Sequence, residues 1–442
     1  MERRCGTATD ADFPDALVAL EDAATSLFRA RKLSDMLSLI RAEGQRIWSV
    51  TGSQGLIAGS EQLDRLCLRV GQKMQCVPKQ QSEFSARRRR RHVYAVSELY
   101  ADGGHTRVLE DLIAAYPRDD HHVIWVYGET APPMAKMTEV LRVNGAMPIY
   151  ALHGEPIGKL RWAFRLLAAL DPDVLVHLGH PNDPIALALM LSDSARRLVM
   201  IHHSDCSFSL GRSLQGAVHV ALGRHFQHVA RNAWGLQTAF LPLTCVAPPA
   251  EKLAQPVADR SLVTATSGSA YKFDLGGDPS YLDVLTVRFT AQEGRHFHFG
   301  PLFPKQVERI EKLLDGMGCS RQFVHVPHVP RLAFALKEVG AALYIDSYPV
   351  GGGRAIVEAM AAGLPICAAR HDPNLDGFSF CYPDCLTWSN PAQLRLLLTG
   401  LQTATLERHS VLSRRHFECN HAAVVFKQRL DAVMSQETHY AD

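Results

Sequence analysis

The spacing of apolar and polar positions changes twice along the chain. Between residues 13 and 76 apolar side chains recur at helical spacing, interrupted by a glycine-rich break at 51–60. Ser60 followed by Glu61 is typical of a helix start. This pattern predicts a helical extension over residues 1–76. Residues 77–91 are polar and turn-forming and end in five arginines, so we interpret them as a linker.

From His92 onward, short apolar runs of strand type alternate with helical segments. The runs before the Pro- and Ala-rich stretch 246–260 are 92–97, 122–127, 173–178, 197–202 and 239–243. The runs after it are 261–266, 295–300, 322–327, 341–346 and 364–369. Such alternation predicts parallel sheets covered by helices on both faces. We therefore expect an α/β protein with two Rossmann-like, doubly wound domains, 92–245 and 261–442, joined by a linker at 246–260. The last helix is a candidate for returning to the first domain.

Composition narrows the classes of protein. The 442 residues are 47% apolar and 21% charged, with a net charge of +2, so no general attraction to nucleic acid is expected. The sequence has no apolar run of about 18 residues and no apolar stretch of leader type near its start. Ten cysteines without zinc-site spacing favour a reducing compartment. We expect a cytoplasmic protein. We interpret the arginines at 87–91 as part of a solvated linker, and the same run would suit contact with anionic phospholipid at the inner membrane face, an acidic acceptor or RNA.

The segment 341–369 carries the strongest chemical signal. ALYID is a strand, SYPVGGG a loop, and RAIVEAMAA a helix that stops at Gly363. Gly351, Gly352 and Gly353 would let a diphosphate approach backbone N–H groups at the positive end of the helix dipole. Glu358, one to two turns further on, would reach a ribose diol. A plain glycine turn before a core helix with a surface glutamate would have the same pattern.

The stretch GGGRAIVEAMAAGLPI resembles the C-terminal donor motif E-A-M-A-x-G-x-P of GT-B glycosyltransferases. The resemblance implies two Rossmann-like domains facing a cleft. It also implies a nucleotide-sugar donor, which we expect to be UDP-linked, and a saccharide, lipid or protein acceptor. It implies no cofactor and no metal, and it gives Glu358 the ribose contact.

Two positions depart from the motif of the large retaining family. The first glutamate of its E-x7-E pattern would fall at position 350, where this chain has Val350. In this respect the loop is similar to the D-x-x-P-x-x-G-x-T loop of the O-linked GlcNAc transferase branch, through Asp346, Pro349 and Gly352. Arg354 stands near the position of its threonine. Both retention and inversion of the anomeric centre stay open.

Other donor contacts follow from the same resemblance. Lys272, in the small-residue loop that also holds Ser269, corresponds to the basic residue that neutralises the donor diphosphate, where negative charge develops on the leaving group. A lysine after a strand is also commonly just a solvated group. The resemblance places His328 and Val329 at the base of the nucleotide. Tyr348 and Arg354 complete the expected donor loop.

Histidines supply the candidates for the acceptor half. The loop GGHTR, with Gly103, Gly104 and His105, is similar to the glycine-rich acceptor-side loop of GT-B enzymes. His202 and His203 end a predicted strand, and either can remove a proton from an acceptor hydroxyl, with Asp205 orienting it. His180 ends another strand and is a further candidate base. Histidines that merely cap strands would give the same spacing.

Two other functions fit this pattern. One is a nucleotide-sugar epimerase of the same fold, which needs no acceptor. The other is a non-catalytic member that binds a nucleotide or a partner protein, which the valine at position 350 would suit. Release of nucleoside diphosphate, isomerisation of the sugar, or neither would separate the three functions.

Overall fold

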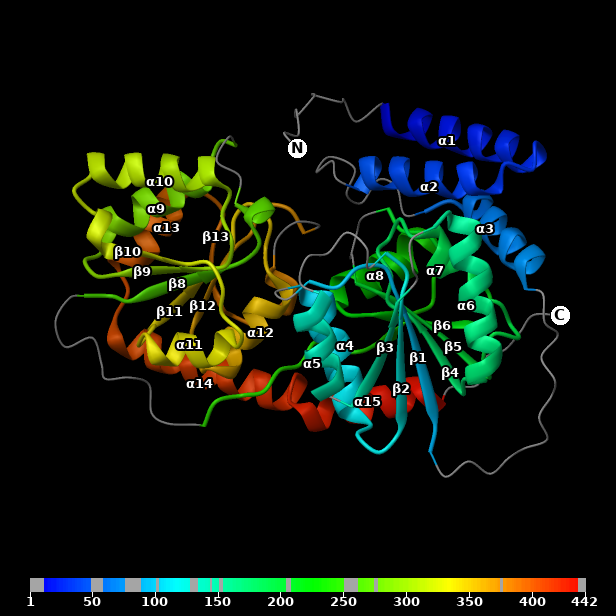
Figure 1. The fold of residues 1–442 in the computed structure, drawn as a ribbon. Helices are drawn as coiled ribbons and strands as arrows, with labels where there is room; N and C mark the ends of the chain where they lie inside the picture. Colours follow the sequence, from blue (N-terminus) through cyan, green and yellow to red (C-terminus); the bar gives the residue numbers. More distant parts are fainter. Residues whose placement is uncertain are drawn as a thin grey trace. The chain divides into compact units, whose positions relative to one another are not determined.

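The computed structural model describes residues 12–48, 59–75, 89–100, 103–127, 134–143, 145–150, 154–203, 208–249, 261–273, 277–373 and 377–435. The predicted linkers at 77–91 and 246–260 lie largely outside these residues, as does Asp205. The chain forms two compact units, both seen in Figure 1. Unit 1 comprises residues 1–222, 226–241 and 431–442, and unit 2 comprises residues 223–225 and 242–430.

Unit 1 contains a parallel sheet with the strand order β3-β2-β1-β4-β5-β6-β7. Its strands are β1 (Arg91–Val96), β2 (Asp120–Trp125), β3 (Ala146–Tyr150), β4 (Val174–His177), β5 (Arg197–His202), β6 (Ala217–Ala221) and β7 (Ala239–Phe240). Its helices include α4 (Gly104–Ala115), α5 (Met134–Val143), α6 (Pro156–Leu170), α7 (Pro184–Ala188) and α8 (Arg224–Trp234). The order reverses at β1 and β4, so the loops after these strands diverge and leave room for a ligand.

The N-terminal helices α1 (Asp12–Arg29), α2 (Leu33–Trp48) and α3 (Glu61–Met74) belong to unit 1. Ser60 caps α3 by accepting a hydrogen bond from Leu63 N at 3.0 Å, as the sequence predicted. Apolar residues of all three helices share one hydrophobic core with the sheet and with α6 and α7. A Cβ at Gly71 of α3 would lie 2.2 Å from the Ala188 carbonyl oxygen of α7, so the two backbones touch at this glycine. The extension is thus a packed layer of the unit.

Unit 2 contains a second parallel sheet, with the strand order β10-β9-β8-β11-β12-β13. Its strands are β8 (Thr264–Ser267), β9 (His296–Phe299), β10 (Phe323–Val326), β11 (Leu343–Ile345), β12 (Ile366–Ala369) and β13 (Leu386–Trp388). Its helices include α9 (Tyr281–Ala291), α10 (Pro304–Gly316), α11 (Leu332–Glu338), α12 (Gly353–Ala361), α13 (Pro391–Thr399) and α14 (Thr403–Asn420). The order reverses between β8 and β11, and the loops after these two strands carry Lys272 and the glycine-rich segment.

The helix α15 (Ala423–Ser435) begins in unit 2, and its last turn belongs to unit 1. Within unit 1, the Tyr116 hydroxyl donates to the Asp431 carboxylate at 2.8 Å, and Arg197 Nη1 donates to the Val433 carbonyl at 3.4 Å. Two hydrogen bonds therefore join the end of α15 to unit 1, one at the C-cap of α4 and one at the start of β5. Among the described helices, none combines the length and apolarity needed to cross a membrane.

Candidate functional site

The glycine-rich loop of unit 2 lies between β11 and α12. Asp346, which is 3% exposed, follows the strand directly, and its carboxylate accepts a hydrogen bond from Gly352 N at 3.1 Å. The Ser347 hydroxyl donates to the Val350 carbonyl at 2.7 Å. Gly352 is the N-cap of α12, and the N–H groups in the first turn of a helix have no partner within the helix. The loop is folded back on its own strand and ends at the positive pole of α12.

The glycines of this loop also have a packing role. A Cβ at Gly353 would lie 3.0 Å from Cζ of the Phe380 ring, so that ring fits closely over this position. A Cβ at Gly352 would meet nothing closer than 3.4 Å, which is ordinary contact. The N–H of Gly352 is already bonded to Asp346. Of the three glycines from which sequence analysis predicted a phosphate cradle, at least one is therefore fixed by packing.

Lys272 lies at the end of the short 3-10 helix Ala270–Lys272, in the loop after β8. Its Nζ donates a hydrogen bond to the Gly351 carbonyl at 2.6 Å, and its own carbonyl accepts one from Val350 N at 3.4 Å. The structure thus brings Lys272 and the glycine-rich loop together from adjacent strands, as the motif implies. Ser269, the N-cap of the 3-10 helix, is exposed beside them.

Glu358 projects from α12 toward the start of α11. One carboxylate oxygen pairs with Arg354 Nε at 3.2 Å, and the other accepts a hydrogen bond from Ala333 N at 3.3 Å. Both Arg354 and Glu358 side chains are 15% exposed. The loop that leads into α11 carries His328, which is exposed, and Val329, which is half-buried. Glu358 therefore contacts the element that follows the predicted base-binding loop.

Tyr348 lies in the predicted donor loop, with its ring turned toward the core. Its ring is 5% exposed and packs against Trp388 at 5.0 Å and His371 at 5.1 Å between ring centroids. Burial raises the pKa of its hydroxyl above the usual value. This tyrosine supports the loop from the core side, and its ring faces other aromatic side chains.

In unit 1, histidines predicted from three separate loops gather at the carboxyl ends of the strands. His105 opens α4, His180 follows β4, and His203 follows β5. Their ring centroids lie 5.3 Å (His105–His180), 5.5 Å (His105–His203) and 6.3 Å (His180–His203) apart. Tyr100, 44% exposed, stacks on His180 at 6.1 Å with an interplanar angle of 15°. We call these four residues the imidazole cluster.

The two glycines before His105 have unequal roles. A Cβ at Gly103 would lie 3.1 Å from the His105 ring and 3.2 Å from Tyr100 Cβ, so a side chain there would press on the cluster. A Cβ at Gly104 would meet nothing within 4 Å. Gly103 is therefore the position at which the close approach of loop and ring favours glycine.

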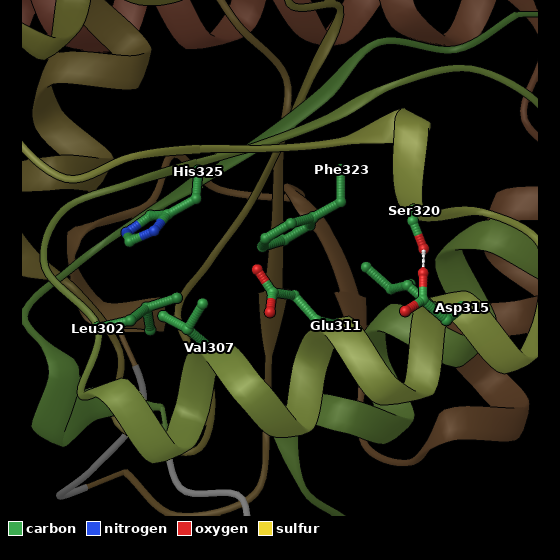
Figure 2. Close-up of a pocket in the computed structure, with 8 residues that line it drawn as sticks. Leu302, Val307, Glu311, Asp315, Ser320, Phe323 and His325 are labelled. Carbon is green, nitrogen blue, oxygen red and sulfur yellow. Dashed lines mark hydrogen bonds between the residues drawn. The ribbon is translucent and has the colours of Figure 1, made fainter.

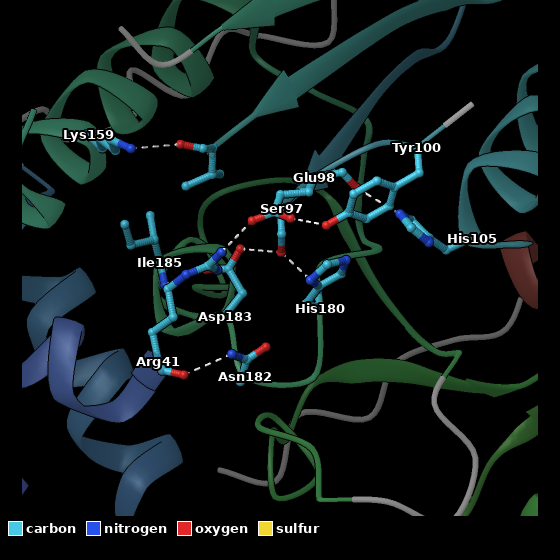
Figure 3. Close-up of polar contacts among 11 residues, drawn as sticks. Arg41, Ser97, Glu98, Tyr100, His105, Lys159, His180, Asn182, Asp183 and Ile185 are labelled. Atoms are coloured by element: carbon cyan, nitrogen blue, oxygen red, sulfur yellow. Dashed lines mark hydrogen bonds and ion pairs between the residues drawn. The ribbon is translucent and has the colours of Figure 1, made fainter. Parts of the chain in front are cut away.

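The imidazole cluster rests on a buried polar network. The Ser97 hydroxyl donates to Asp183 Oδ2 at 2.5 Å and accepts from His180 N at 2.7 Å. Asp183 also caps α7 by accepting from Ile185 N and Ala186 N, both at 2.9 Å. Figure 3 shows Ser97, His180 and Asp183 joined in this way. The loops after β1 and β4 are thereby locked to each other beneath the histidine rings.

Electrostatics keep the clustered histidines neutral. Burial, and then the neighbouring His105 and Arg41, lower the pKa of His180 to about 3. Burial followed by the charges of His105, His180 and His177 places the pKa of His203 well below its ordinary value. For His105 burial lowers the pKa, and a hydrogen bond to the Glu98 carbonyl partly opposes it. A neutral imidazole is the form that accepts a proton.

His202 does not join this cluster. It is 3% exposed, and its Nε2 lies 2.9 Å from His219 Nδ1, with the two rings stacked at 5.2 Å. His219 in turn donates from Nε2 to the Leu214 carbonyl at 2.7 Å. His202 is the last residue of β5 and contacts His219, whereas His203 lies beyond the strand and contacts His105 and His180, so the two histidines belong to different sets of contacts. His202 has the core contacts of a structural histidine.

Several side chains around the cluster were not predicted from the sequence. Glu98 and Tyr100 lie in the loop after β1, where a polar residue following a strand was the available signal. Asp183 could have been recognised as a helix cap before Pro184. Arg41 comes from α2, far away in sequence, and only the folded chain brings it to the site.

Unit 2 also has a surface pocket of about 360 Å³, away from the predicted donor residues. Figure 2 shows Glu311 pointing toward Phe323 across it, with His325 at one side. None of the predicted donor residues lines this pocket. Within the part of the chain that the structure describes, no group of three or more His, Cys, Asp or Glu side chains is arranged to hold a metal ion.

The two parallel, doubly wound units define the class of fold, which is the GT-B fold of glycosyltransferases, and the predicted resemblance is confirmed at this level. No protein-family model and no curated protein sequence matches the chain. Solved structures do match it. HepE from Anabaena in complex with UDP and glucose aligns with a TM-score of 0.58 and 13% identity, over 78% of this chain and 99% of that one.

Two further matches agree with this fold. A glycosyltransferase from Rickettsia africae aligns with a TM-score of 0.60 and 11% identity, over 78% of this chain and 98% of that one. A mutant of the O-GlcNAc transferase of Thermobaculum terrenum aligns with a TM-score of 0.58 and 16% identity, over 94% of this chain and 80% of that one. A match over 94% of the chain necessarily includes part of the N-terminal helices.

Proposed function

We propose that this protein is a glycosyltransferase that moves a sugar from a nucleotide donor, UDP-linked, to a hydroxyl group of an acceptor. The observation that carries the proposal is the convergence of Lys272, the glycine-rich loop and the start of α12 at the switch point of the second sheet. A cation beside a helix N-terminus stabilises a departing diphosphate. Structural neighbours with UDP or UDP-glucose bound support the same donor.

Each donor residue has a distinct task in this proposal. Lys272 Nζ, now bonded to the Gly351 carbonyl, turns toward the diphosphate and neutralises the charge that develops on it. Arg354 and the N–H groups of the first turn of α12 add further donors. Glu358 binds the ribose hydroxyls with the carboxylate that now bonds Arg354 and Ala333 N. These residues hold the leaving group with no metal assigned to the site.

Unit 1 supplies the acceptor side in this proposal. His203 and His105 are neutral imidazoles of partly exposed residues, and one of them takes the proton of the acceptor hydroxyl as the glycosidic bond forms. His180 and Tyr100 shape the surrounding surface. We favour a saccharide hydroxyl as acceptor, since an exposed tyrosine ring offers a flat apolar face to a sugar ring.

Donor binding tests the proposal first. Calorimetric titration with UDP should give saturable binding. Lys272→Met and Glu358→Gln should each weaken it by about 1–3 kcal/mol, because each removes one charge-assisted contact. Matched controls are Lys337→Met, whose amine also donates to a carbonyl, and Glu418→Gln, which pairs with an arginine four residues before it. Equal UDP affinity in all four variants would contradict the assignment of the donor site.

Product analysis then separates the functions that share this fold. Incubation with UDP-glucose or UDP-N-acetylglucosamine should release UDP slowly, because water replaces the missing acceptor. Conversion of the sugar without UDP release would identify an epimerase. UDP binding with neither product would identify a non-catalytic nucleotide-binding protein.

A further inference from the structure

Arg41 connects the N-terminal helices to the loops that carry the candidate acceptor site. Its Nη2 pairs with Glu98 Oε1 at 2.7 Å, and its guanidinium lies 3.5 Å from the ring centroid of Tyr127. Its carbonyl accepts a hydrogen bond from Asn182 Nδ2 at 2.8 Å. These three partners follow β1, β2 and β4, at the carboxyl ends of the strands. In Figure 3 Arg41 reaches from its helix to the loops that hold Glu98 and Asn182.

Glu98 extends the contact from Arg41 to the imidazole cluster. Its second carboxylate oxygen accepts a hydrogen bond from the Tyr100 hydroxyl, and its backbone carbonyl accepts one from His105 Nε2 at 2.7 Å. A carbonyl can only accept, so neutral His105 carries its proton on Nε2 and keeps the lone pair of Nδ1 for another partner. Arg41 therefore pairs with the residue whose carboxylate accepts from Tyr100 and whose backbone carbonyl accepts from His105.

The contact is poorly explained as an anchor for the helices. The shared core already fixes the extension, as do the touching backbones at Gly71 and the hydrogen bonds of Asp64 to Gly211 and Ser213. In addition, Arg41 Nη1 is buried and makes no hydrogen bond to a described residue. A buried donor without a hydrogen bond lowers the free energy of unfolding by about 1–3 kcal/mol. An apolar side chain would fill this position at lower cost, so a role at the site is the better explanation.

We propose that Arg41 is a positioning residue of the acceptor site, which holds Glu98 and, through it, Tyr100 and His105. The inference rests on the proposed function, and it makes the N-terminal helices a structural part of that site. Arg41 touches no reacting atom and acts through Glu98. The charged and titratable groups around the cluster, among the described residues, are Arg41, Glu98, Tyr100, His105, His177, His180, Asp183 and His203.

The first test uses the full chain and UDP-glucose, with water as acceptor. Arg41→Met keeps the apolar stem and removes the charge, and Arg41→Lys keeps the charge without the planar fork. We expect Arg41→Met to lower kcat for UDP release by about 10- to 100-fold, the effect of misplacing a catalytic group by about 1 Å. The KM for UDP-glucose should stay unchanged, and Arg41→Lys should recover part of kcat. The control is Arg46→Met, on the same helix and more exposed.

The second test requires no turnover. Histidine labelled with carbon-13 gives one ring signal per residue, and the His105 signal is the one lost in His105→Gln. This signal should move in Arg41→Met and in Glu98→Gln, return toward its wild-type position in Arg41→Lys, and stay in place in Arg46→Met. An unmoved signal overturns the inference, as does a lower melting temperature with unchanged kcat. If the wild type neither binds UDP nor releases it, the proposed function fails, and the ring signal alone decides the role of Arg41.

Discussion

Replacing Asp64 by Asn tests how the N-terminal helices are joined to the loop after β5. Asp64 lies on α3 and is 1% exposed. Its Oδ1 accepts a hydrogen bond from Gly211 N at 2.6 Å, and its Oδ2 accepts from Ser213 N at 3.0 Å and from the Ser213 hydroxyl at 2.7 Å. Asn has the same shape but only one acceptor oxygen.

The expected loss of stability in Asp64→Asn follows from these hydrogen bonds. If the amide oxygen keeps the bond to Gly211, the amide nitrogen faces the Ser213 N–H, and two donors oppose each other. The buried N–H then loses its partner, at a cost of about 1–3 kcal/mol, and the bond to Gly211 loses its charge assistance, about 1 kcal/mol more. Removal of a buried charge offsets part of this loss. We expect the free energy of unfolding of unit 1 to fall by about 2–3 kcal/mol at pH 7.

The assay must report unit 1 alone, because a chain with two units need not unfold in one step. Hydrogen exchange of peptides from α3 and from residues 208–215, measured across a urea series, provides this. The control is Glu61→Gln on the same helix, an exposed carboxylate paired with Arg65, which should cost less than about 0.5 kcal/mol. If Asp64→Asn costs no more than this control, the bonds of Asp64 do not join the helices to the loop.

The pKa of Asp64 also predicts how the effect of Asp64→Asn on stability changes with pH. Burial raises the pKa of Asp64 above its usual value, although its hydrogen bonds act in the opposite direction. The folded state therefore binds the proton more tightly than the unfolded state. The stabilisation from this proton is complete below the unfolded pKa of about 3.9 and is lost as pH rises through the folded pKa. The stability difference between wild type and Asp64→Asn should grow as pH falls from 7 toward 4, and a shrinking difference would refute this reasoning.

Two further predictions concern packing and the histidines. Gly71→Ala places a methyl group 2.2 Å from the Ala188 carbonyl oxygen and should lower the stability of unit 1 by about 1–3 kcal/mol, whereas Gly158→Ala, in open space on α6, should leave it equal or higher. Urea unfolding compares the two, and equal stabilities would contradict the close approach of α3 and α7. His202→Gln should lower the stability of unit 1 and leave UDP binding unchanged. His203→Gln should lower the rate of UDP release from UDP-glucose with little change in stability. The opposite pattern would mean that His203 is the structural histidine and His202 the one at the acceptor site.

The sequence predicted strands well where an apolar run was central and uninterrupted. The run 197–202 coincides with β5, and the run 295–300 contains β9. Strands β3, β6 and β13 were missed. β3 is an edge strand with Pro148 in its middle, which weakens the strand pattern. β13 has only three residues, and Thr387 interrupts its apolar run, unlike the short strand β11, which lies in a longer apolar run.

The candidate sites were predicted in part, for a physical reason. The donor loop is one continuous segment, so its glycines and Glu358 could be recognised from the sequence. Lys272 follows β8, which is the neighbour of β11 in the sheet. The histidines were recognised as strand-end residues, but spacing does not reveal which side of the sheet a ring takes. His202 and His203 show this, since one is bonded in the core and the other lies in the cluster. Arg41 depends on helix packing, which leaves no short-range signal.

The return of α15 has a consequence for synthesis on the ribosome. Unit 1 is not one continuous stretch of chain, since the end of α15 is bonded to it through Tyr116, at the end of α4, and Arg197, in β5. Domains tend to fold in the order in which they emerge. Here the C-terminal segment of unit 1 is synthesised only after all of unit 2 has been translated. A gene truncated after residue 241 encodes unit 1 without the end of α15. A chain whose translation stops before residue 431 lacks the same segment.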